Sequence, residues 1–120
     1  MFSKNSFEFK RNFTFQERKM ESNRVISKYE DRLPVICERN KKSNLINIDK
    51  NKYLVPKDLT IGQFIYIIRK RMNLPEEKAI FLMVNGIIPQ QNENMFNIYY
   101  KYKDDDDFLY LSYTSENVFG

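Results

Sequence analysis

The sequence contains no histidine and no tryptophan, and its 120 residues include only one cysteine, three glycines and four prolines. Without histidine, the Ser-His-Asp and Cys-His arrangements of nucleophilic enzymes are excluded, as is the usual general base near neutral pH. A single cysteine, Cys37, can form neither an internal disulfide nor a thiolate zinc site, which favours a reducing compartment such as the cytosol. The three glycines lie too far apart for a phosphate-binding loop. These absences favour a binding or carrier protein over an enzyme, with no metal site and no cofactor expected.

Long apolar runs are missing as well. No stretch approaches the roughly 18 residues of a membrane span, and residues 1–13 alternate polar and aromatic types, unlike a signal peptide. Hydrophobic residues make up 42% of the chain, enough for one core. The net charge of +4 is unevenly distributed, since residues 31–72 carry +6 and residues 73–120 carry −5. A basic middle favours acidic partners at one surface over a continuous nucleic-acid stripe.

Two capping boxes predict two helices. Thr14 and Glu17 have the spacing that caps a helix over residues 14–29, and a weaker helical turn is expected over residues 6–11. The apolar face of the first helix is predicted to hold Phe15, Ser22, Val25, Ile26 and Tyr29. Thr60 and Gln63 cap a longer amphipathic helix that ends near residues 74–75. A short third helix is expected over residues 94–102.

Four segments are expected to be strands. Residues 33–38 and the alternating residues 50–55 predict a hairpin, while the continuous apolar run 79–84 predicts a central strand covered on both faces. Residues 85–86 predict a turn, and residues 108–113 a final strand. The four aspartates at 104–107 lack the spacing of a calcium loop, so a solvated turn is expected there. Residues 115–120 are expected to be a mobile tail.

This order of elements favours an α+β fold of the ubiquitin-like β-grasp type, preceded by an N-terminal helical extension. A β-grasp has a four-stranded mixed sheet with one long and one short helix, although unrelated folds share the order. The expected organisation is a single domain with a helical extension over residues 1–30, a core over 31–114 and a flexible C-terminal tail over 115–120.

Several motifs carry a specific resemblance: DRLPVI at 31–36, DKNKYLVPKDLT at 49–60, FLMVN at 81–85, FLY at 108–110 and the terminal FG. Over residues 15–120 the chain resembles the autophagy ubiquitin-like modifiers of the GABARAP and microtubule-associated light-chain-3 type, whereas residues 1–14 match poorly. The resemblance implies a non-enzymatic modifier joined through Gly120 to phosphatidylethanolamine on autophagic membranes. It implies activating and conjugating enzymes and a deconjugating cysteine protease as partners. It also implies a cytoplasmic protein that lies on the autophagosome membrane when lipidated.

The resemblance further implies that aromatic-x-x-aliphatic motifs of cargo receptors bind as an added strand along residues 50–55. The implied aromatic pocket consists of Glu21, Val25, Pro34, Lys50, Lys52, Leu54 and Phe108. The implied aliphatic pocket consists of Tyr53, Val55, Pro56, Leu59, Phe64 and Ile67. Acidic residues flanking the motif would meet Arg32 and Arg71, with Lys50 and Lys52. An exposed strand edge gives this mode a mechanism, because it offers backbone hydrogen bonds and reads alternate side chains.

Other interpretations stay open at this point. Val55, Leu59 and Phe64 could be core residues, and Lys50 and Lys52 could protect an edge from aggregation. Cys37 is interpreted as a small buried hydrophobe. The chain could also be an unconjugated cytosolic peptide-binding module, or a basic protein that associates with microtubules or nucleic acid. No nucleic-acid motif accompanies the tyrosines, so no specific nucleic-acid partner is expected.

Overall fold

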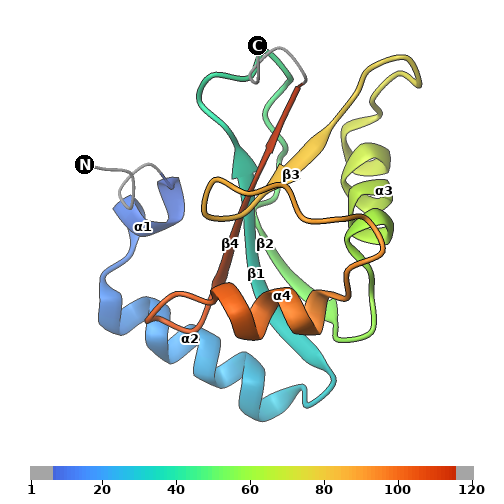
Figure 1. Cartoon of the computed structure of the whole chain (residues 1–120). Helices are drawn as coiled ribbons and strands as arrows, with labels where there is room; N and C mark the ends of the chain where they lie inside the picture. The colour runs from blue at the N-terminus through green and yellow to red at the C-terminus, as the bar shows by residue number, and fades with distance from the viewer. Residues whose placement is uncertain (1–6, 116–120) are drawn as a thin grey trace.

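A computed structural model describes residues 7–115 of the chain (Figure 1). Its elements, in order, are α1 (Glu8–Asn12), α2 (Phe15–Lys28), β1 (Arg32–Arg39), β2 (Lys52–Pro56), α3 (Ile61–Met72), β3 (Phe81–Met83), α4 (Met95–Tyr102) and β4 (Leu109–Thr114). The four strands form one mixed sheet in the order β2-β1-β4-β3. The predicted β-grasp architecture with N-terminal helices is therefore confirmed.

Both predicted capping boxes are present, and they explain where the two longest helices begin. Thr14 Oγ1 accepts from the Glu17 N–H at 3.1 Å while Glu17 accepts from the Thr14 N–H at 2.8 Å. Thr60 and Gln63 make the same reciprocal pair at the start of α3. α3 ends at Asn73, whose left-handed backbone (φ 54°) closes the last turn.

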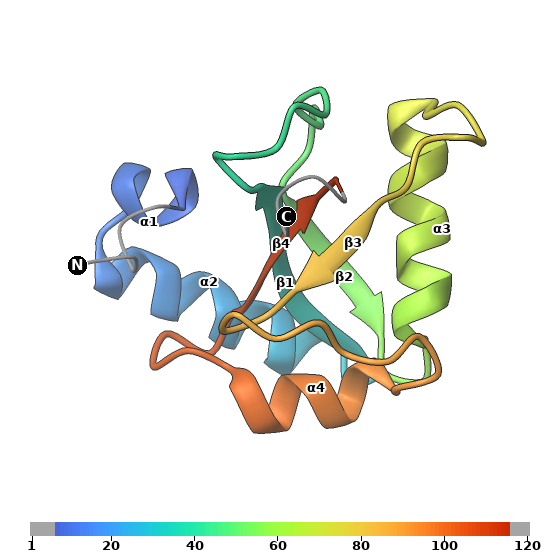
Figure 2. The same cartoon turned by 45° about the horizontal axis from the view of Figure 1, so that its top comes forward.

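The main core lies between the sheet and the two C-terminal helices. Leu33, Val35 and Cys37 of β1 point into it, and alternate residues of β2 and β4 do the same. α3 covers this face, and α4 closes one end of it, as Figures 1 and 2 show. Cys37 is fully buried here and burial raises the pKa of its thiol, which confirms its interpretation as a small hydrophobe.

The apolar run at 79–84 does not form the predicted central strand. β3 comprises only Phe81–Met83 and lies at the sheet edge, with β4 as its sheet neighbour, so that β4 takes the central place beside β1. Ile80, Leu82 and Val84 are buried, but Phe81 and Met83 are only half-buried, because helices cover one face of this strand alone. The predicted turn is confirmed: Asn85 and Gly86 have φ of 49° and 76°, and Val84 and Ile87 exchange two hydrogen bonds.

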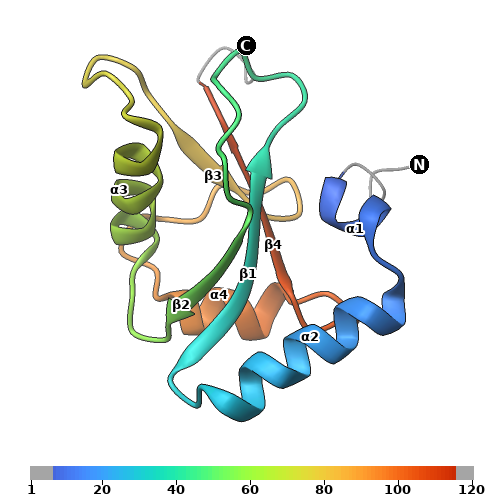
Figure 3. The ribbon, with the colours of Figure 1, turned by 180° about the vertical axis from the view of Figure 1, so that it is seen from behind.

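α1 and α2 cover the opposite face of the sheet from α3 (Figure 3). Phe9 of α1 lies 5.0 Å, ring centre to ring centre, from Phe108, and with Ile36 and Tyr110 these rings form a second small core. Ser22 and Val25 of α2 are fully buried as predicted. Phe15 and Ile26, placed on the same face by the sequence pattern, are instead 44% and 41% exposed.

The aspartate loop is not the solvated turn that the sequence predicted. Asp106 is fully buried, and Asp104 and Asp107 are mostly covered. Each of the three pairs with a base from the N-terminal helices: Lys10–Asp104 at 2.7 Å, Arg18–Asp106 at 2.6 Å and Lys19–Asp107 at 2.8 Å. The partners lie almost the whole chain apart in sequence, so no local pattern reveals them. α1 and α2 are thus ion-paired to the loop that leads into β4.

Because ion pairs attach α1 and α2 to the aspartate loop, we expect this attachment to weaken in acid. Burial alone would raise the pKa of Asp104, but hydrogen bonds from Lys10 and from the Asp106 N–H outweigh it and lower that pKa; Lys19 and Lys103 do the same for Asp107. A lowered folded-state pKa stabilises the fold above the unfolded-state value, and this stabilisation is lost as pH falls through the folded-state value. We expect the free energy of unfolding to fall as the pH drops below about 5, by on the order of 1 kcal/mol for partly exposed ion pairs of this kind.

Urea unfolding at a series of pH values checks this expectation. The double variant Asp104→Asn/Asp107→Asn should lose part of the acid-dependent slope, whereas Asp105→Asn, at the exposed position of the same loop, should keep the wild-type slope. Equal slopes in all three proteins would contradict the assignment.

The described chain ends just beyond β4. Ser115, predicted as the first residue of the mobile tail, is buried, and its hydroxyl lies 3.3 Å from Asn44 Oδ1. The rest of the predicted tail, including Gly120, lies outside the described residues, and the domain boundaries drawn from the sequence stay predictions. No helix within residues 7–115 is long and apolar enough to cross a membrane.

Candidate functional site

The free edge of β2 is the element on which the candidate site is built. β2 pairs antiparallel with β1 and occupies one end of the sheet. Cys37 N–H donates to Asn51 O at 2.8 Å, and by the alternation of an antiparallel ladder residues 53 and 55 also face β1. The backbone groups of Lys52 and Leu54 therefore face outward. The Leu54 carbonyl accepts from Arg32 Nη1 at 3.3 Å, so the Arg32 guanidinium lies across this edge.

Most of the residues expected for the aromatic pocket meet on the α2 side of this edge. They are Glu21 and Val25 on α2, Pro34 on β1, Lys52 and Leu54 on β2, and Phe108 just before β4. Pro34 and Leu54 are register partners, and Glu21 Oε2 lies 2.5 Å from Lys52 Nζ. Lys50 is set apart, because its ammonium lies 5.0 Å from the centre of the Tyr53 ring.

The residues expected for the aromatic pocket do not form an open pocket in this structure. Val25 and Phe108 are fully buried, Phe9 packs on Phe108 from α1, and the Glu21–Lys52 ion pair joins α2 to β2. Arg24 and Lys52 hydrogen-bond the Glu21 carboxylate and lower its pKa to about 2, so it is ionised at neutral pH. An aromatic ring entering here has to part α2 from β2.

The residues expected for the aliphatic pocket lie on the opposite, α3 side of β2, but half of them are core. Tyr53, Val55 and Phe64 are 6%, 2% and 1% exposed, and the Tyr53 and Phe64 rings meet edge to face at 5.4 Å. Burial raises the pKa of the Tyr53 phenol, whose hydroxyl donates to Lys50 O. The core interpretation of Val55 and Phe64 is thereby confirmed. Pro56 and Leu59 are half-buried and Ile67 is 41% exposed, so these three remain accessible.

Leu59 and Ile67 line a groove of about 630 Å³ along α3. The other lining residues were not among the predicted site residues; they are Thr60, Gly62, Gln63, Tyr66, Gln91 and Asn92. Tyr66 is 61% exposed and directly precedes Ile67 on α3. The sequence contained one signal for this residue: Tyr66 falls on the polar face of the amphipathic helix, where a large aromatic side chain is unusual and suggests a contact with a partner.

The two arginines expected to meet acidic flanking residues lie at opposite ends of β2. Arg32 pairs with Pro56 at the end of the strand, next to the aliphatic set, whereas Arg71 is ion-paired with Asp49 at 2.7 Å, before the strand begins. The structure therefore does not bring Arg32 and Arg71 together as one basic flank.

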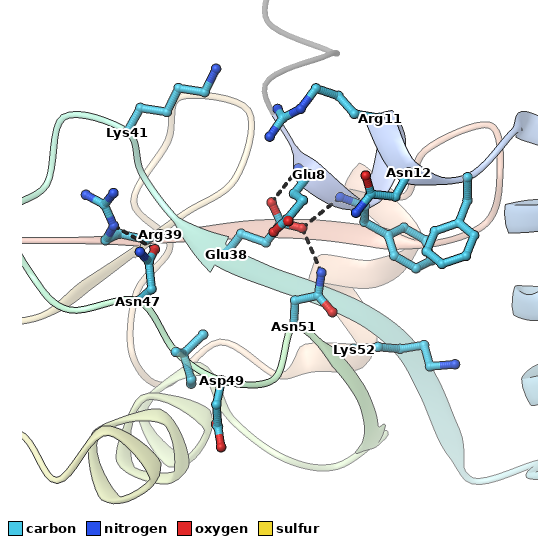
Figure 4. Close-up of a pocket in the computed structure, with 13 residues that line it drawn as sticks. Glu8, Arg11, Asn12, Glu38, Arg39, Lys41, Asn47, Asp49, Asn51 and Lys52 are labelled. Atoms are coloured by element: carbon cyan, nitrogen blue, oxygen red, sulfur yellow. Dashed lines mark hydrogen bonds between the residues drawn. The ribbon is translucent and has the colours of Figure 1, made fainter.

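A polar groove of about 640 Å³ lies at the beginning of β2, between α1 and the end of β1 (Figure 4). Arg11 and Lys41 stand at its rim, and Arg39 and Lys52 also line it. At its centre the Glu38 carboxylate accepts from the Glu8 and Phe9 N–H groups and from Asn51, which fixes the start of α1 against β1. No pattern in residues 7–12 indicated that α1 would pack here, because its partner Glu38 lies about thirty positions away along the chain.

The chemistry of these surfaces is that of recognition. Among residues 7–115 no group of three or more His, Cys, Asp or Glu residues is arranged to hold a metal ion. The edge of β2 has outward-facing backbone groups. On one face of β2 the Glu21–Lys52 ion pair joins the strand to α2, and on the other face lies the apolar groove with Leu59 and Ile67. An added strand, whose side chains point alternately to the two faces, matches this arrangement. Fold and site together define a ubiquitin-like protein with a free strand edge between two side-chain sites.

Comparisons with known proteins show which family of ubiquitin-like proteins this chain resembles. Residues 17–120 match the family described as "Autophagy protein Atg8 ubiquitin like". The chain is 57% identical to autophagy-related protein 8 of Kluyveromyces lactis over 112 residues, which is 93% of this chain and 90% of the relative. It is 53% identical to autophagy-related protein 8 of Schizosaccharomyces pombe over 113 residues, covering 94% and 93%.

Two solved structures are similar throughout. The crystal structure of Trypanosoma brucei ATG8 matches with a TM-score of 0.89 and 40% identity, covering 92% of this chain and 96% of that one. Plasmodium falciparum Atg8, solved in complex with a P. falciparum Atg3 peptide, matches with a TM-score of 0.81 and 36% identity, covering 91% and 98%. The chain belongs to the Atg8 family of ubiquitin-like autophagy proteins.

Proposed function

We propose that this protein is a modifier that is conjugated through Gly120 to phosphatidylethanolamine on autophagosome membranes and is not itself an enzyme. The observation that carries the proposal is the family match, which runs from residue 17 to the terminal glycine without leaving the tail out. Glycine suits a tail that is passed between active sites, because it has no Cβ to clash in narrow channels. The protein would be cytoplasmic before conjugation and membrane-bound afterwards.

The chemistry belongs to other proteins. An activating enzyme would adenylate the Gly120 carboxylate with ATP, releasing pyrophosphate, and pass it to its own cysteine as a thioester with release of AMP. A conjugating enzyme would take over the thioester, and the amine of phosphatidylethanolamine would then displace its thiolate and form an amide. A deconjugating cysteine protease would hydrolyse that amide.

Reconstitution tests this proposal. The full chain is incubated with an activating and a conjugating enzyme of an Atg8 pathway, ATP and liposomes containing phosphatidylethanolamine, and its intact mass is measured. We expect a phospholipid-sized mass increase that is absent from Gly120→Ala and from liposomes lacking phosphatidylethanolamine. Enzymes that lipidate an Atg8 control but leave this chain unmodified would overturn the proposal and favour an unconjugated peptide-binding module.

We further propose that the β2 edge binds aromatic-x-x-aliphatic peptides of cargo receptors and of the conjugating enzyme. The complex of P. falciparum Atg8 with an Atg3 peptide supports peptide binding by a protein of this family. The aromatic side chain would enter between α2 and β2, and the aliphatic one would contact Pro56, Leu59 and Ile67. The aromatic set lies nearer the start of β2, so the peptide would run parallel to β2. Acidic residues before the motif would then reach the polar groove with Arg11 and Lys41.

Two contacts have to open when such a peptide binds. The Glu21–Lys52 ion pair covers the way to Val25 and Phe108, and Arg32 occupies the Leu54 carbonyl that an added strand would use. Both are partly exposed contacts, of the kind that contributes about 1 kcal/mol or less. Their loss is therefore small beside the burial of two large apolar side chains.

The accessible side chains of the edge give a prediction on affinity. Leu54→Ala and Ile67→Ala should each weaken the binding of a synthetic aromatic-x-x-aliphatic peptide by about 1–2 kcal/mol, that is, by roughly five- to thirtyfold, while stability changes little. Isothermal titration calorimetry measures the affinity and thermal melting the stability. Ile88→Ala, an equally exposed isoleucine beyond the 85–86 turn, is the matched control and should bind like the wild type. Equal affinities in the wild type and all three variants would contradict the proposal that the peptide binds at this edge.

A further inference from the structure

A third groove lies between α2 and α4, past the end of β2. It has a volume of about 330 Å³ and is lined by Ile26 of α2, by Leu33 of β1 and by Tyr99 and Tyr100 of α4. Figures 1 and 2 both show the two helices side by side below the sheet. Ile26 is 41% exposed and Tyr100 55% exposed, so an apolar side chain entering the groove would meet both.

The apolar surface continues along α4. Phe96, 39% exposed, lies one turn before Tyr100, and their rings meet at 4.6 Å. The amphipathic pattern of α4 does not require this pair, because Met95, Ile98 and Tyr99 already supply its buried face. Two aromatic rings packed edge to face, beside an exposed isoleucine, form a larger apolar patch than scattered surface residues do.

Cations surround this patch. Lys57 Nζ lies 5.6 Å from the centre of the Phe96 ring, Lys103 Nζ lies 5.8 Å from that of Tyr100, and Arg32 lines the groove. The two carboxylates of the lining are Glu30 and Asp107, and Asp107 is already ion-paired with Lys19 and Lys103. The groove therefore combines apolar walls with an excess of positive charge, which complements an acidic segment that carries an apolar side chain.

We propose that the α2–α4 groove is a docking site for an acidic peptide segment of a partner protein. An aliphatic side chain of the segment lies between Ile26 and Tyr100, and its carboxylates meet Lys57 and Lys103. The apolar side chains of Ile26, Leu33 and Tyr100 in the lining offer nothing to a nucleic-acid phosphate backbone, which favours a peptide. A membrane is disfavoured by position: β4 begins beside α4 and ends with Thr114 at the far end of the sheet (Figure 1), so a chain held by its C-terminal residue, as proposed above, directs this groove away from the lipid.

A peptide selection tests the proposal without assuming its sequence. A displayed random dodecapeptide library is first depleted on the full-length variant Lys57→Glu/Tyr100→Ala and then selected on the full-length wild type. We expect surviving peptides to be rich in Asp and Glu around a Leu, Ile or Phe. The synthetic peptides should shift the amide NMR signals of Ile26 and Tyr100 and leave those of Lys52 and Leu54 in place.

Single variants separate charge from folding. Lys57→Glu alone should weaken the selected peptides by about tenfold or more. Lys70→Glu is the matched control, because Lys70 makes the same kind of contact with an aromatic ring, Tyr66, at 5.5 Å on α3, and it should bind like the wild type. No surviving peptide, survivors rich in Lys and Arg, equal losses in both lysine variants, or shifts confined to the β2 edge would each overturn the proposal. Shifts confined to the β2 edge would instead support peptide binding there, and none of the outcomes bears on conjugation through Gly120.

Discussion

Replacing Asp106 with alanine is expected to lower the free energy of unfolding by about 3–5 kcal/mol. The Asp106 carboxylate is fully buried and accepts from Arg18 at 2.6 Å, from the Tyr110 hydroxyl at 2.6 Å and from the Phe108 N–H at 2.8 Å. Alanine would remove the acceptor for all three donors at once. Most of the loss is expected from two groups left without a partner: the largely buried guanidinium of Arg18 and the buried hydroxyl of Tyr110.

Urea unfolding of the full chain measures this effect, with Asp105→Ala as the matched control. Asp105 is the exposed neighbour in the same loop, and its replacement should change the free energy of unfolding by no more than about 0.5 kcal/mol. Asp106→Asn keeps the shape and should lie between the two, since an amide oxygen still accepts one or two of the bonds. Similar stabilities for Asp106→Ala and Asp105→Ala would refute a central role for the buried carboxylate.

The same variant reports on the N-terminal helices. Ser22 Oγ donates to the Asp106 carbonyl at 2.6 Å, and Arg18 and Lys19 of α2 reach Asp106 and Asp107. If α2 is attached chiefly through this loop, hydrogen exchange of α2 amides in Asp106→Ala should accelerate more than that of α3 amides. Uniform acceleration would instead mean that the loop stabilises the whole domain and not α2 in particular.

Local signals in the sequence predicted the helices and strands, but not all of the contacts that these elements make with one another. Two capping boxes located the starts of α2 and α3, and alternation at residues 50–55 separated the two faces of β2, one of which proves to be buried. Asn-Gly located the turn at 85–86. Each of these signals depends on residues a few positions apart, and each was confirmed.

The errors came from contacts between distant residues. A continuous apolar run such as 79–84 is compatible with a central strand and with an edge strand whose other face is half-covered, and composition does not separate the two. The aspartates at 104–107 resemble a solvated loop unless their partners Lys10, Arg18 and Lys19 are known. Ile26 fits the helical period of α2, yet it faces the α4 groove and not the core.

For the site, the family resemblance pointed to a strand that does have a free edge in the structure, but it was less specific about individual side chains. Residues that line a pocket and residues that support it from beneath have the same apolar character in sequence, and only burial distinguishes them. Val55 and Phe64 lie in the core, whereas Leu59 and Ile67 border an open groove. Arg32 and Arg71 were grouped by charge, but the β1–β2 register assigns Arg32 to the end of β2.

Tyr53→Ala is expected to destabilise the fold by about 3–5 kcal/mol and not simply to weaken peptide binding. The Tyr53 side chain is 6% exposed, its ring packs edge to face on Phe64, and its hydroxyl donates to Lys50 O at 2.8 Å. Truncation would leave a cavity between β2 and α3 and release the turn before β2. Because β2 is an edge strand held by β1 alone on its other side, little else would keep it in register.

Two control variants separate the contributions. Tyr53→Phe keeps the ring and loses only the hydrogen bond, so it should cost about 0.5–1.5 kcal/mol. Tyr66→Ala removes a tyrosine that is 61% exposed on α3 and should change stability by about 0.5 kcal/mol or less. Urea unfolding provides all three values, and calorimetric titration of the folded variants at low temperature provides the peptide affinities.

If Tyr53→Ala unfolds near the wild-type midpoint but no longer binds the peptide, Tyr53 is a contact residue and the groove extends beneath β2. If it is strongly destabilised and Tyr53→Phe binds normally, the aliphatic side chain is bound by Pro56, Leu59 and Ile67 above an intact core. We expect the second result, because an edge strand can present a recognition surface on its outside only when the side chains beneath it hold the strand in place.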